Sequence, residues 1–158
     1  MIEIERKFLV KSDAFKTLAR SKTRIVQGFL NTDPHRTVRI RVAGDTGLIT
    51  VKGISNAAGT ARFEWEKEIT VKEAEALLLL CEKGSLEKYR YEIPVGAHVF
   101  EVDEFLRENE GLIVAEVELE SENELFDRPD WLGTEVTGEV AYYNSQLSQN
   151  PYSKWKRY

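Results

Sequence analysis

The chain has 158 residues, 42% of them hydrophobic and 31% charged, which is the usual size of one domain built around a single core. With 27 acidic against 22 basic side chains its formal net charge is -5, which argues against binding nucleic acid by overall positive charge. Its one cysteine, Cys81, allows no internal disulfide, and no stretch approaches the roughly 18 consecutive apolar residues of a membrane span. We therefore expect one cytoplasmic domain over residues 1–158, with no nucleic-acid or membrane partner.

Apolar and charged residues alternate in many short segments, a pattern typical of strands with one buried face. In the first of them, at 2–8, Glu3, Glu5 and Lys7 share one face and apolar side chains share the other. The same pattern predicts further strands at 24–32, 37–42, 48–52, 62–69, 88–91, 100–105 and 115–120. The sequence thus predicts about eight strands.

Helices are fewer. The best candidate covers 72–83, with Thr70 before it as a cap, and shorter helices are expected at 12–20 and from about 138 to 148. A helix at 72–83 could cover the apolar faces of strands from outside. Residues from about 150 read as a frayed tail, although the aromatic residues there could instead form a dimer contact, so a homodimer stays open.

Several charged faces of the predicted strands carry one sign of charge, although the face of the strand at 62–69 mixes both signs. Arg39 and Arg41 share one strand face, whereas Glu116 and Glu118 share another. Alternation alone does not say whether such faces point to solvent or inward, but a solvated surface normally mixes the two signs. Like charges on one strand repel and require opposite partners, which favours an inward orientation.

A closed barrel of roughly eight strands has room inside for side chains or one small ligand. Carboxylates gathered there favour a hard divalent cation with oxygen ligands. Arginine and lysine beside them suit phosphate oxygens, arginine by planar bidentate contacts and lysine as a compact charge. Metal and phosphate binding therefore follow from one arrangement.

The segment Glu3-Ile4-Glu5-Arg6-Lys7 resembles the Glu-x-Glu-x-Lys signature of the CYTH, or triphosphate tunnel metalloenzyme, superfamily. Further motifs of that superfamily match in order along the chain: Arg39 and Arg41, Lys52, Arg62 to Glu66, Lys88 with Arg90, Asp103, Glu116 with Glu118, and Glu135-Val136-Thr137-Gly138. Each motif alone is weak, but the ordered set, which covers residues 1 to about 145, is specific.

The resemblance implies an α+β fold, a closed antiparallel eight-stranded barrel or tunnel with a few helices packed outside, and dependence on Mg²⁺ or Mn²⁺. It also implies roles for most of the matching residues. Metal binding would fall to Glu3, Glu5, Glu116 and Glu118, triphosphate binding to Lys7, Arg39, Arg41, Lys52, Lys88 and Arg90, and the orientation of water or of a second metal to Glu64, Glu66 and Asp103.

Two departures from the superfamily pattern bear on the substrate. Phe29 stands where relatives often have tyrosine, and the region around Ala141 lacks a basic residue that they often carry. The leading expectation is hydrolysis of a triphosphate, with inorganic tripolyphosphate first and nucleoside or thiamine triphosphates behind it. Two alternatives stay open: an adenylate cyclase that converts ATP to cyclic AMP, and a non-catalytic module that binds polyphosphate or a nucleotide.

Overall fold

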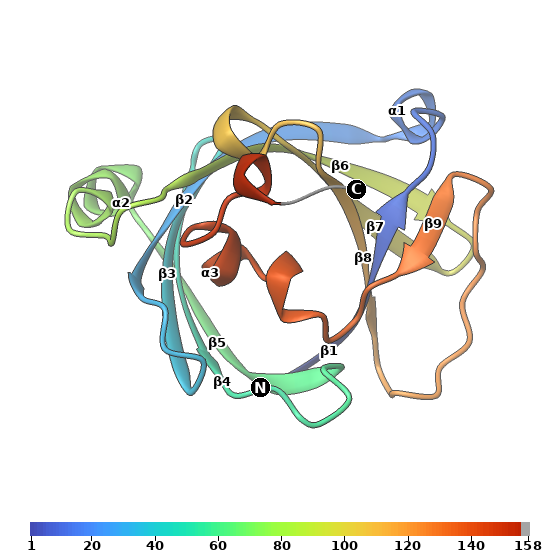
Figure 1. Cartoon of the computed structure of the whole chain (residues 1–158), viewed down its shortest axis with the longest axis horizontal. Coiled ribbons are helices and arrows are strands. Elements are labelled where there is room, and N and C mark those ends of the chain that lie inside the picture. The colour runs from blue at the N-terminus through green and yellow to red at the C-terminus, as the bar shows by residue number, and fades with distance from the viewer. Residues whose placement is uncertain (156–158) are drawn as a thin grey trace.

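The computed structural model describes residues 1–155 and consists mainly of strands (Figure 1). The strands are β1 (Ile2–Val10), β2 (Ser21–Asn31), β3 (Arg36–Ala43), β4 (Thr46–Gly53), β5 (Ala61–Ile69), β6 (Leu86–Val95), β7 (His98–Phe105), β8 (Ile113–Leu119) and β9 (Leu132–Glu135). The α-helices are α1 (Phe15–Leu18), α2 (Val71–Leu78) and α3 (Asn144–Leu147), and short 3-10 helices cover Arg107–Asn109, Val140–Tyr142 and Tyr152–Lys154.

The strands form one antiparallel sheet that closes on itself. Their order is β5-β4-β3-β2-β6-β7-β8-β1-β9, and β5 also pairs with β1. Eight strands therefore form a ring, and β9 pairs with the far end of β1. The predicted closed antiparallel eight-stranded barrel is confirmed. The ninth strand was not predicted, because its four residues are too few to show a clear alternation.

The helices are shorter than predicted. The capping box at Thr70 and Glu73 starts α2 as expected, but the helix ends at Leu78, where the N–H groups of Leu80 and Cys81 bond only three residues back. The segment at 12–20 contains only the single turn of α1, and the one at 138–148 is divided into a 3-10 turn and α3. Among residues 1–155 no helix has the length and apolar character needed to cross a membrane.

A large apolar cluster lies on the outer faces of β1, β6, β7 and β8. Phe15 of α1 is fully buried in it, with its ring 5.3 Å from that of Tyr91 and 5.9 Å from that of Trp131. Phe100 packs edge-on against Trp131 at 5.6 Å. Because the apolar faces of these strands are covered from outside, their charged faces point into the barrel.

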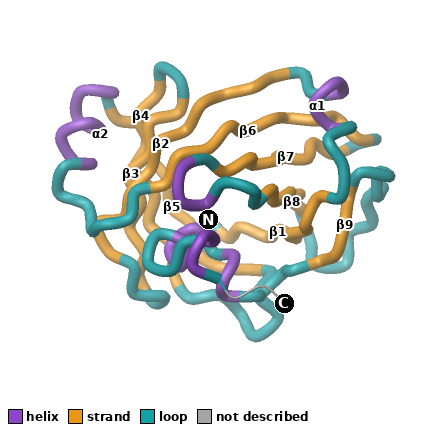
Figure 2. Tube along the Cα trace, turned by 45° about the horizontal axis from the view of Figure 1, so that its top comes forward, coloured by secondary structure: helices purple, strands orange, loops and turns teal. Residues whose placement is uncertain are grey.

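The C-terminal segment lies across one mouth of the barrel rather than outside it (Figures 1 and 2). Leu147 of α3 is fully buried in a second apolar cluster with Phe29 and Phe105. Tyr152 and Trp155 pack beside it, with their rings 5.1 Å apart, in the region where a tail was expected from about residue 150. The rest of that expected tail, 156–158, lies outside the described residues.

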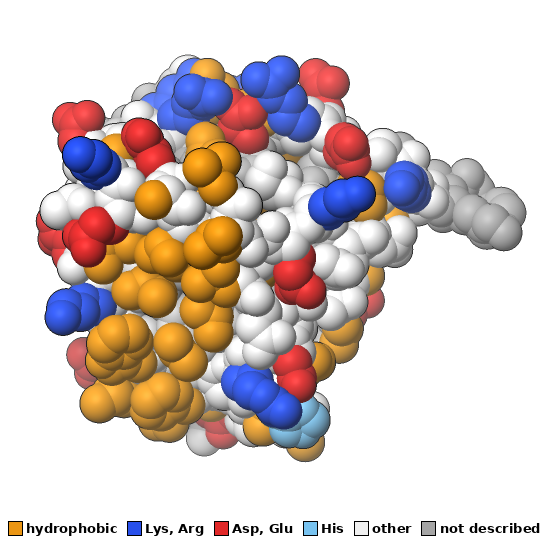
Figure 3. Space-filling model, turned by 90° about the vertical axis from the view of Figure 1, so that its left-hand side faces the viewer, with side chains coloured by type: hydrophobic (Ala, Val, Ile, Leu, Met, Phe, Trp, Pro, Cys, Tyr) orange, Lys and Arg blue, Asp and Glu red, His pale blue; other side chains and the backbone are white. Residues whose placement is uncertain are grey.

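One side of the barrel keeps an exposed apolar surface. Figure 3 shows apolar side chains gathered on the side where α2 lies. Leu79 and Leu80, which follow α2, are 87% and 73% exposed, and Phe63 and Trp65 of β5 are 43% and 38% exposed. The outside of the barrel is therefore covered unevenly.

The seam between β1 and β5 is the shortest contact in the ring, with Ile2–Ile4 opposite Ala61–Phe63. Beside it two loops touch through glycine, because a Cβ at Gly59 would lie 2.3 Å from the Cα of Gly138. Both glycines have positive φ, +73° and +79°, a conformation that costs other residues free energy. Only glycine at both positions lets the loops close the seam.

We predict that Gly59→Ala lowers the free energy of unfolding more than Gly44→Ala does. Gly44 has a similar φ of +57°, but its added Cβ would find its nearest neighbour at 3.6 Å, so this variant measures backbone strain alone, about 1–2 kcal/mol. Gly59→Ala adds the clash to that strain. Urea unfolding of both variants checks this, and equal losses would mean that the contact between the loops does not support the seam.

Candidate active site

A cavity of about 220 Å³ lies inside the barrel and is lined mostly by charged side chains. All the predicted site residues except Asp103 line it: Glu3, Glu5, Lys7, Arg39, Arg41, Lys52, Glu64, Glu66, Lys88, Arg90, Glu116 and Glu118. They reach it because alternate residues of each strand point inward. The inward orientation expected from the segregated charges is therefore what the structure has.

The register of the sheet gathers carboxylates on one part of the wall. Glu5 lies opposite Glu118 across the β1–β8 ladder, and Glu116 lies opposite Glu101 across the β7–β8 ladder. Glu3 follows on the same face of β1. The strands thus bring together acidic groups that are far apart in the sequence.

Burial and mutual repulsion change how these carboxylates ionise. Burial raises the pKa of Glu5 well above its usual range, and the charges of Glu116 and Glu3 add to that effect. Burial and a hydrogen bond with Glu3 raise the pKa of Glu64 to about 7. Burial opposes ionisation of Glu116 as well, but Lys7 and Arg90 outweigh it and lower its pKa to about 2. At neutral pH the group therefore holds fewer negative charges than it has carboxylates.

Lysines occupy part of the space between these carboxylates. Lys52 Nζ donates to Glu3 Oε1 at 2.8 Å, and Lys7 Nζ lies 3.7 Å from Glu116 Oε1. As the side chains stand, no three His, Cys, Asp or Glu residues within 1–155 converge closely enough to hold a metal ion. The donor set nevertheless fits a hard divalent cation, because it offers several carboxylate oxygens whose charge is now offset by protons and lysines.

The basic part of the wall comes from β3 and β6. Burial lowers the pKa of Arg41 to about 9 and that of Lys88 to about 7, and repulsion from neighbouring arginines contributes to both shifts. The buried Nε atoms of Arg39 and Arg41 have no hydrogen-bond partner among the described residues. Clustered cations that repel one another indicate a site for an anion with several oxygens.

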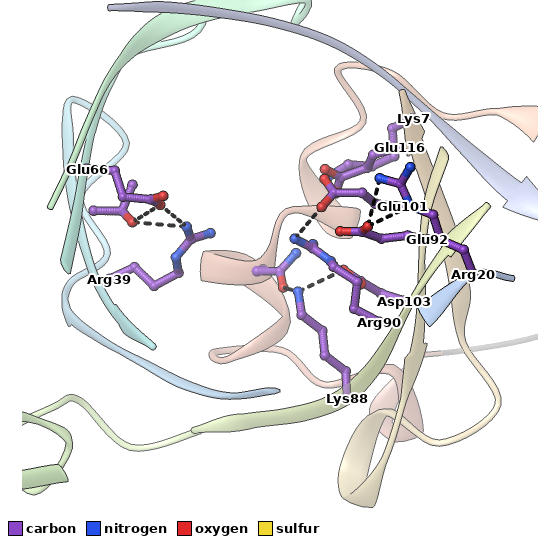
Figure 4. Close-up of polar contacts among 12 residues, drawn as sticks. Lys7, Arg20, Arg39, Glu66, Lys88, Arg90, Glu92, Glu101, Asp103 and Glu116 are labelled. Carbon is purple, nitrogen blue, oxygen red and sulfur yellow. Dashed lines mark hydrogen bonds and ion pairs between the residues drawn. The ribbon is translucent and has the colours of Figure 1, made fainter. Parts of the chain in front are cut away.

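Asp103 lies behind this wall, 2% exposed, rather than in the cavity. Its two oxygens accept from Arg90 Nε and Nη2 at 2.8 Å each, and Lys88 Nζ lies 2.8 Å from its Oδ2 (Figure 4). Burial opposes its ionisation, but Arg90 and Lys88 outweigh it and hold its pKa well below the usual range. Its geometry is that of a counter-ion that positions two cations, which differs from the expected role in orienting water.

The C-terminal segment adds residues that were not among the predicted site residues. Asn144 Oδ1 accepts from Lys88 Nζ at 2.8 Å and from Gln27 Nε2 at 2.9 Å. The ring of Tyr143 lies 5.2 Å from Lys7 Nζ and 5.5 Å from the guanidinium of Arg62. The sequence predicted a helix from about 138 to 148 here, but nothing in it assigned Asn144 or Tyr143 to the site.

Two other lining residues could have been identified from the sequence. Arg62 and Glu101 lie in the same alternating patterns as Glu64 and Asp103, on β5 and β7. The structure places both departures noted in the sequence. Phe29 lines the cavity, but it is 5% exposed and packs in the second apolar cluster. Ala141 lies exposed in a 3-10 turn. At position 29 packing therefore takes the place of a hydroxyl group.

A match to the CYTH domain covers residues 1–149. The chain belongs to the CYTH domain family. An inorganic triphosphatase from Acetivibrio thermocellus is 50% identical over 155 residues, 98% of this chain and 97% of the relative. One from Nitrosomonas europaea is 36% identical over 153 residues, 94% of this chain and 97% of the relative. A crystal structure of an inorganic triphosphatase, also a CYTH relative, superposes with a TM-score of 0.63 and 32% identity, covering 92% of this chain and 97% of the other.

We predict that Asp103→Asn lowers the free energy of unfolding by about 3–5 kcal/mol, because it leaves buried cations without their counter-ion. Glu92→Gln is the matched control on the neighbouring strand. Glu92 pairs with Arg20 at 3.1 Å, but both side chains are exposed, so its loss is expected to cost about 0–1 kcal/mol. Chemical unfolding at neutral pH checks both values, and a loss for Asp103→Asn as small as that of the control would contradict the counter-ion role.

Proposed function

We propose that this CYTH protein is a metal-dependent hydrolase that cleaves inorganic triphosphate inside the barrel. One observation carries the proposal: a cavity inside the barrel has carboxylates on one part of its wall and arginine and lysine side chains on another. The same function is named for the two CYTH relatives above, which align with nearly the whole chain. Such a wall has the charges that a cation and a polyphosphate need together.

The basic residues would hold the substrate. In phosphoryl transfer a protein mainly positions the groups and neutralises charge on the phosphoryl oxygens. Arg39 and Arg41 approach the cavity from one side and Lys88 and Arg90 from the other, as Figure 4 illustrates for three of them. Lys7 and Lys52, now paired with carboxylates, would be released to phosphate oxygens when a cation takes their place.

The carboxylates would hold the divalent cation, which we propose to be Mg²⁺ or Mn²⁺. Its ligands would be drawn from Glu3, Glu5, Glu116 and Glu118. When bound it would neutralise phosphate oxygens and acidify a water molecule. Glu64, with its pKa near 7, is suited to accept a proton from the attacking water. Glu66 would act on the substrate through an arginine: its Oε2 accepts from Thr50 Oγ1 at 2.7 Å and from Arg39 Nη2 at 3.3 Å, which orients Arg39.

We propose that the protein acts in the cytoplasm, where a lone cysteine such as Cys81 stays reduced. Whether it works as a homodimer stays a prediction.

We predict that Glu5→Gln folds normally but loses at least about 100-fold in turnover of inorganic triphosphate. The amide matches the protonated carboxyl that burial already favours, yet it cannot supply an anionic ligand. Glu120→Gln, exposed just beyond β8, is the control and is expected to keep full activity. Phosphate release with saturating Mg²⁺ or Mn²⁺ measures both.

The same assay separates the alternative functions. Phosphate released from inorganic triphosphate supports the hydrolase, cyclic AMP formed from ATP would indicate a cyclase, and binding without turnover would indicate a sensor. Unchanged turnover in Glu5→Gln would contradict the assignment of Glu5 to the metal.

We also predict that metal binding releases protons and weakens as the pH falls from 8 to 6. The pKa values of Glu5 and Glu64 are raised, so these groups hold protons below their folded pKa values. A bound cation would displace the proton of Glu5, a proposed ligand, directly and that of Glu64 through its positive charge. Titration calorimetry with Mg²⁺ or Mn²⁺ in buffers of different ionisation enthalpy counts the protons. Glu64→Gln should reduce the count, and equal heats in every buffer would contradict proton displacement.

A further inference from the structure

Asn144, the first residue of α3, holds the end of a buried lysine. Its Oδ1 accepts a hydrogen bond from Lys88 Nζ at 2.8 Å and another from Gln27 Nε2 at 2.9 Å. Lys88 and Gln27 are buried, whereas Asn144 is only partly buried and lines the charged cavity. A neutral side chain therefore stands among the cations of the basic wall.

These two bonds fix the orientation of the carboxamide group. An ammonium group can only donate, so the atom of Asn144 that lies 2.8 Å from Lys88 Nζ must be the oxygen. Gln27 gives the same oxygen a second donor. The Nδ2 of Asn144 has no acceptor within residues 1–155, and it is not one of the buried polar atoms that lack a partner. This donor is therefore accessible to a ligand.

The residues around Asn144 hold the carboxamide in place. Gln27 is fully buried, and its Oε1 has no partner in the described part of the chain, so its side chain serves to donate to Asn144. Leu147, three residues further on, is fully buried and anchors α3. Lys88 is itself held by Asp103, whose Oδ2 lies 2.8 Å from Nζ (Figure 4). The carboxamide is thus positioned before any ligand binds.

A neutral donor suits this position better than another cation would. Burial, with repulsion from Arg90 and Arg41, has already lowered the pKa of Lys88 to about 7. A further positive charge beside Lys88 would lower that pKa more and reduce the charge that the lysine carries at neutral pH. An amide N–H bonds to an ionised oxygen without adding charge.

We propose that Asn144 is a substrate-binding residue, which donates a hydrogen bond from Nδ2 to a phosphate oxygen of the triphosphate while its Oδ1 holds Lys88. This inference rests on the proposed function for the identity of the ligand. It adds a contact that no strand of the barrel supplies. The affinity for triphosphate then depends on an uncharged residue as well as on the cations.

The variant Asn144→Asp separates the two halves of the carboxamide. A carboxylate still accepts from Lys88 and Gln27, so the free energy of unfolding should not fall, but it has no N–H to donate. We expect kcat/KM for inorganic triphosphate to fall about tenfold or more, mainly through KM. The control Asn150→Asp adds the same charge at an exposed position of the same segment and should leave kcat/KM unchanged.

The variant Asn144→Leu tests whether the added charge alone explains a loss in Asn144→Asp. Leucine has a similar size and no charge, so it removes the N–H donor without repelling phosphate. The KM for inorganic triphosphate should rise in this variant too. An unchanged KM in Asn144→Leu would overturn the inference, because the loss in Asn144→Asp would then come from repulsion.

The side-chain amide of Asn144 gives a readout that does not depend on activity. Its NMR signals are identified by their absence from Asn144→Asp, and inorganic triphosphate is added in EDTA, which prevents metal-dependent turnover. A bond to phosphate should move these amide protons downfield and slow their exchange with solvent. The shift should exceed that of the Gln27 amide, which is already bonded to Asn144. A merely structural Asn144 would show no such difference.

The outcomes distinguish this inference from the proposed function. If Asn144→Asp keeps the wild-type KM, or if saturating triphosphate leaves the Asn144 amide signals unmoved, the inference is overturned although hydrolysis stands. If the signals move but no phosphate is released with Mg²⁺ or Mn²⁺, the proposed function fails and the contact stands, and dissociation constants from calorimetry then replace KM. If the folded protein binds no triphosphate either in EDTA or with Mg²⁺, both are overturned.

Discussion

Ring closure is the constraint on which the site depends. Because β1 pairs with β8 on one side and β5 on the other, the strands enclose a cavity in which several charged side chains are removed from bulk solvent. Burial there raises the pKa of Glu5 well above its usual range and lowers that of Arg41 to about 9. An open sheet with the same alternation would leave both groups hydrated and ordinary. The unusual chemistry of the cavity is thus a property of the topology as much as of the residues.

The two parts of the wall handle their excess charge differently. The basic part has a fixed counter-ion, Asp103, whose oxygens are fully engaged by Arg90 and Lys88. The acidic part has protons, two lysines that a cation can replace, and a contact of Glu101 Oε2 with Arg90 Nη1 at 3.2 Å. The side chains of the basic part are therefore held in place before any ligand binds, whereas the charge of the acidic part can change when a ligand binds. This division fits a site in which a metal ion and a polyphosphate bind next to each other.

The resemblance to the CYTH superfamily implied the closed barrel, and alternation in the sequence predicted which side chains share a face, because strand geometry sends every second residue to the same side. Alternation could not place Asp103, because it shows which face a side chain is on but not whether that side chain reaches the cavity. The neighbouring cations hold this carboxylate behind the wall. Asn144 and Tyr143 were not predicted as site residues, because they belong to a short irregular segment whose position depends on the packing of Leu147. The helix at 72–83 was overestimated because its leucine run does not face the core throughout, as exposed Leu79 shows.

The position of β1 in the ring affects the order in which the molecule can assemble. Glu5 stands opposite Glu118, so the first strand to be synthesised must wait for one of the last before its ladder can form. Pairing strands so far apart in the sequence costs the conformational entropy of closing a long loop before any contact between them can offset it. Such topologies therefore fold slowly. The carboxylates of β1 and β8 therefore remain apart on a nascent chain until nearly all of it has emerged. A divalent ion bound to both strands, as proposed, would stabilise the finished barrel, but it would not serve as an early template for folding.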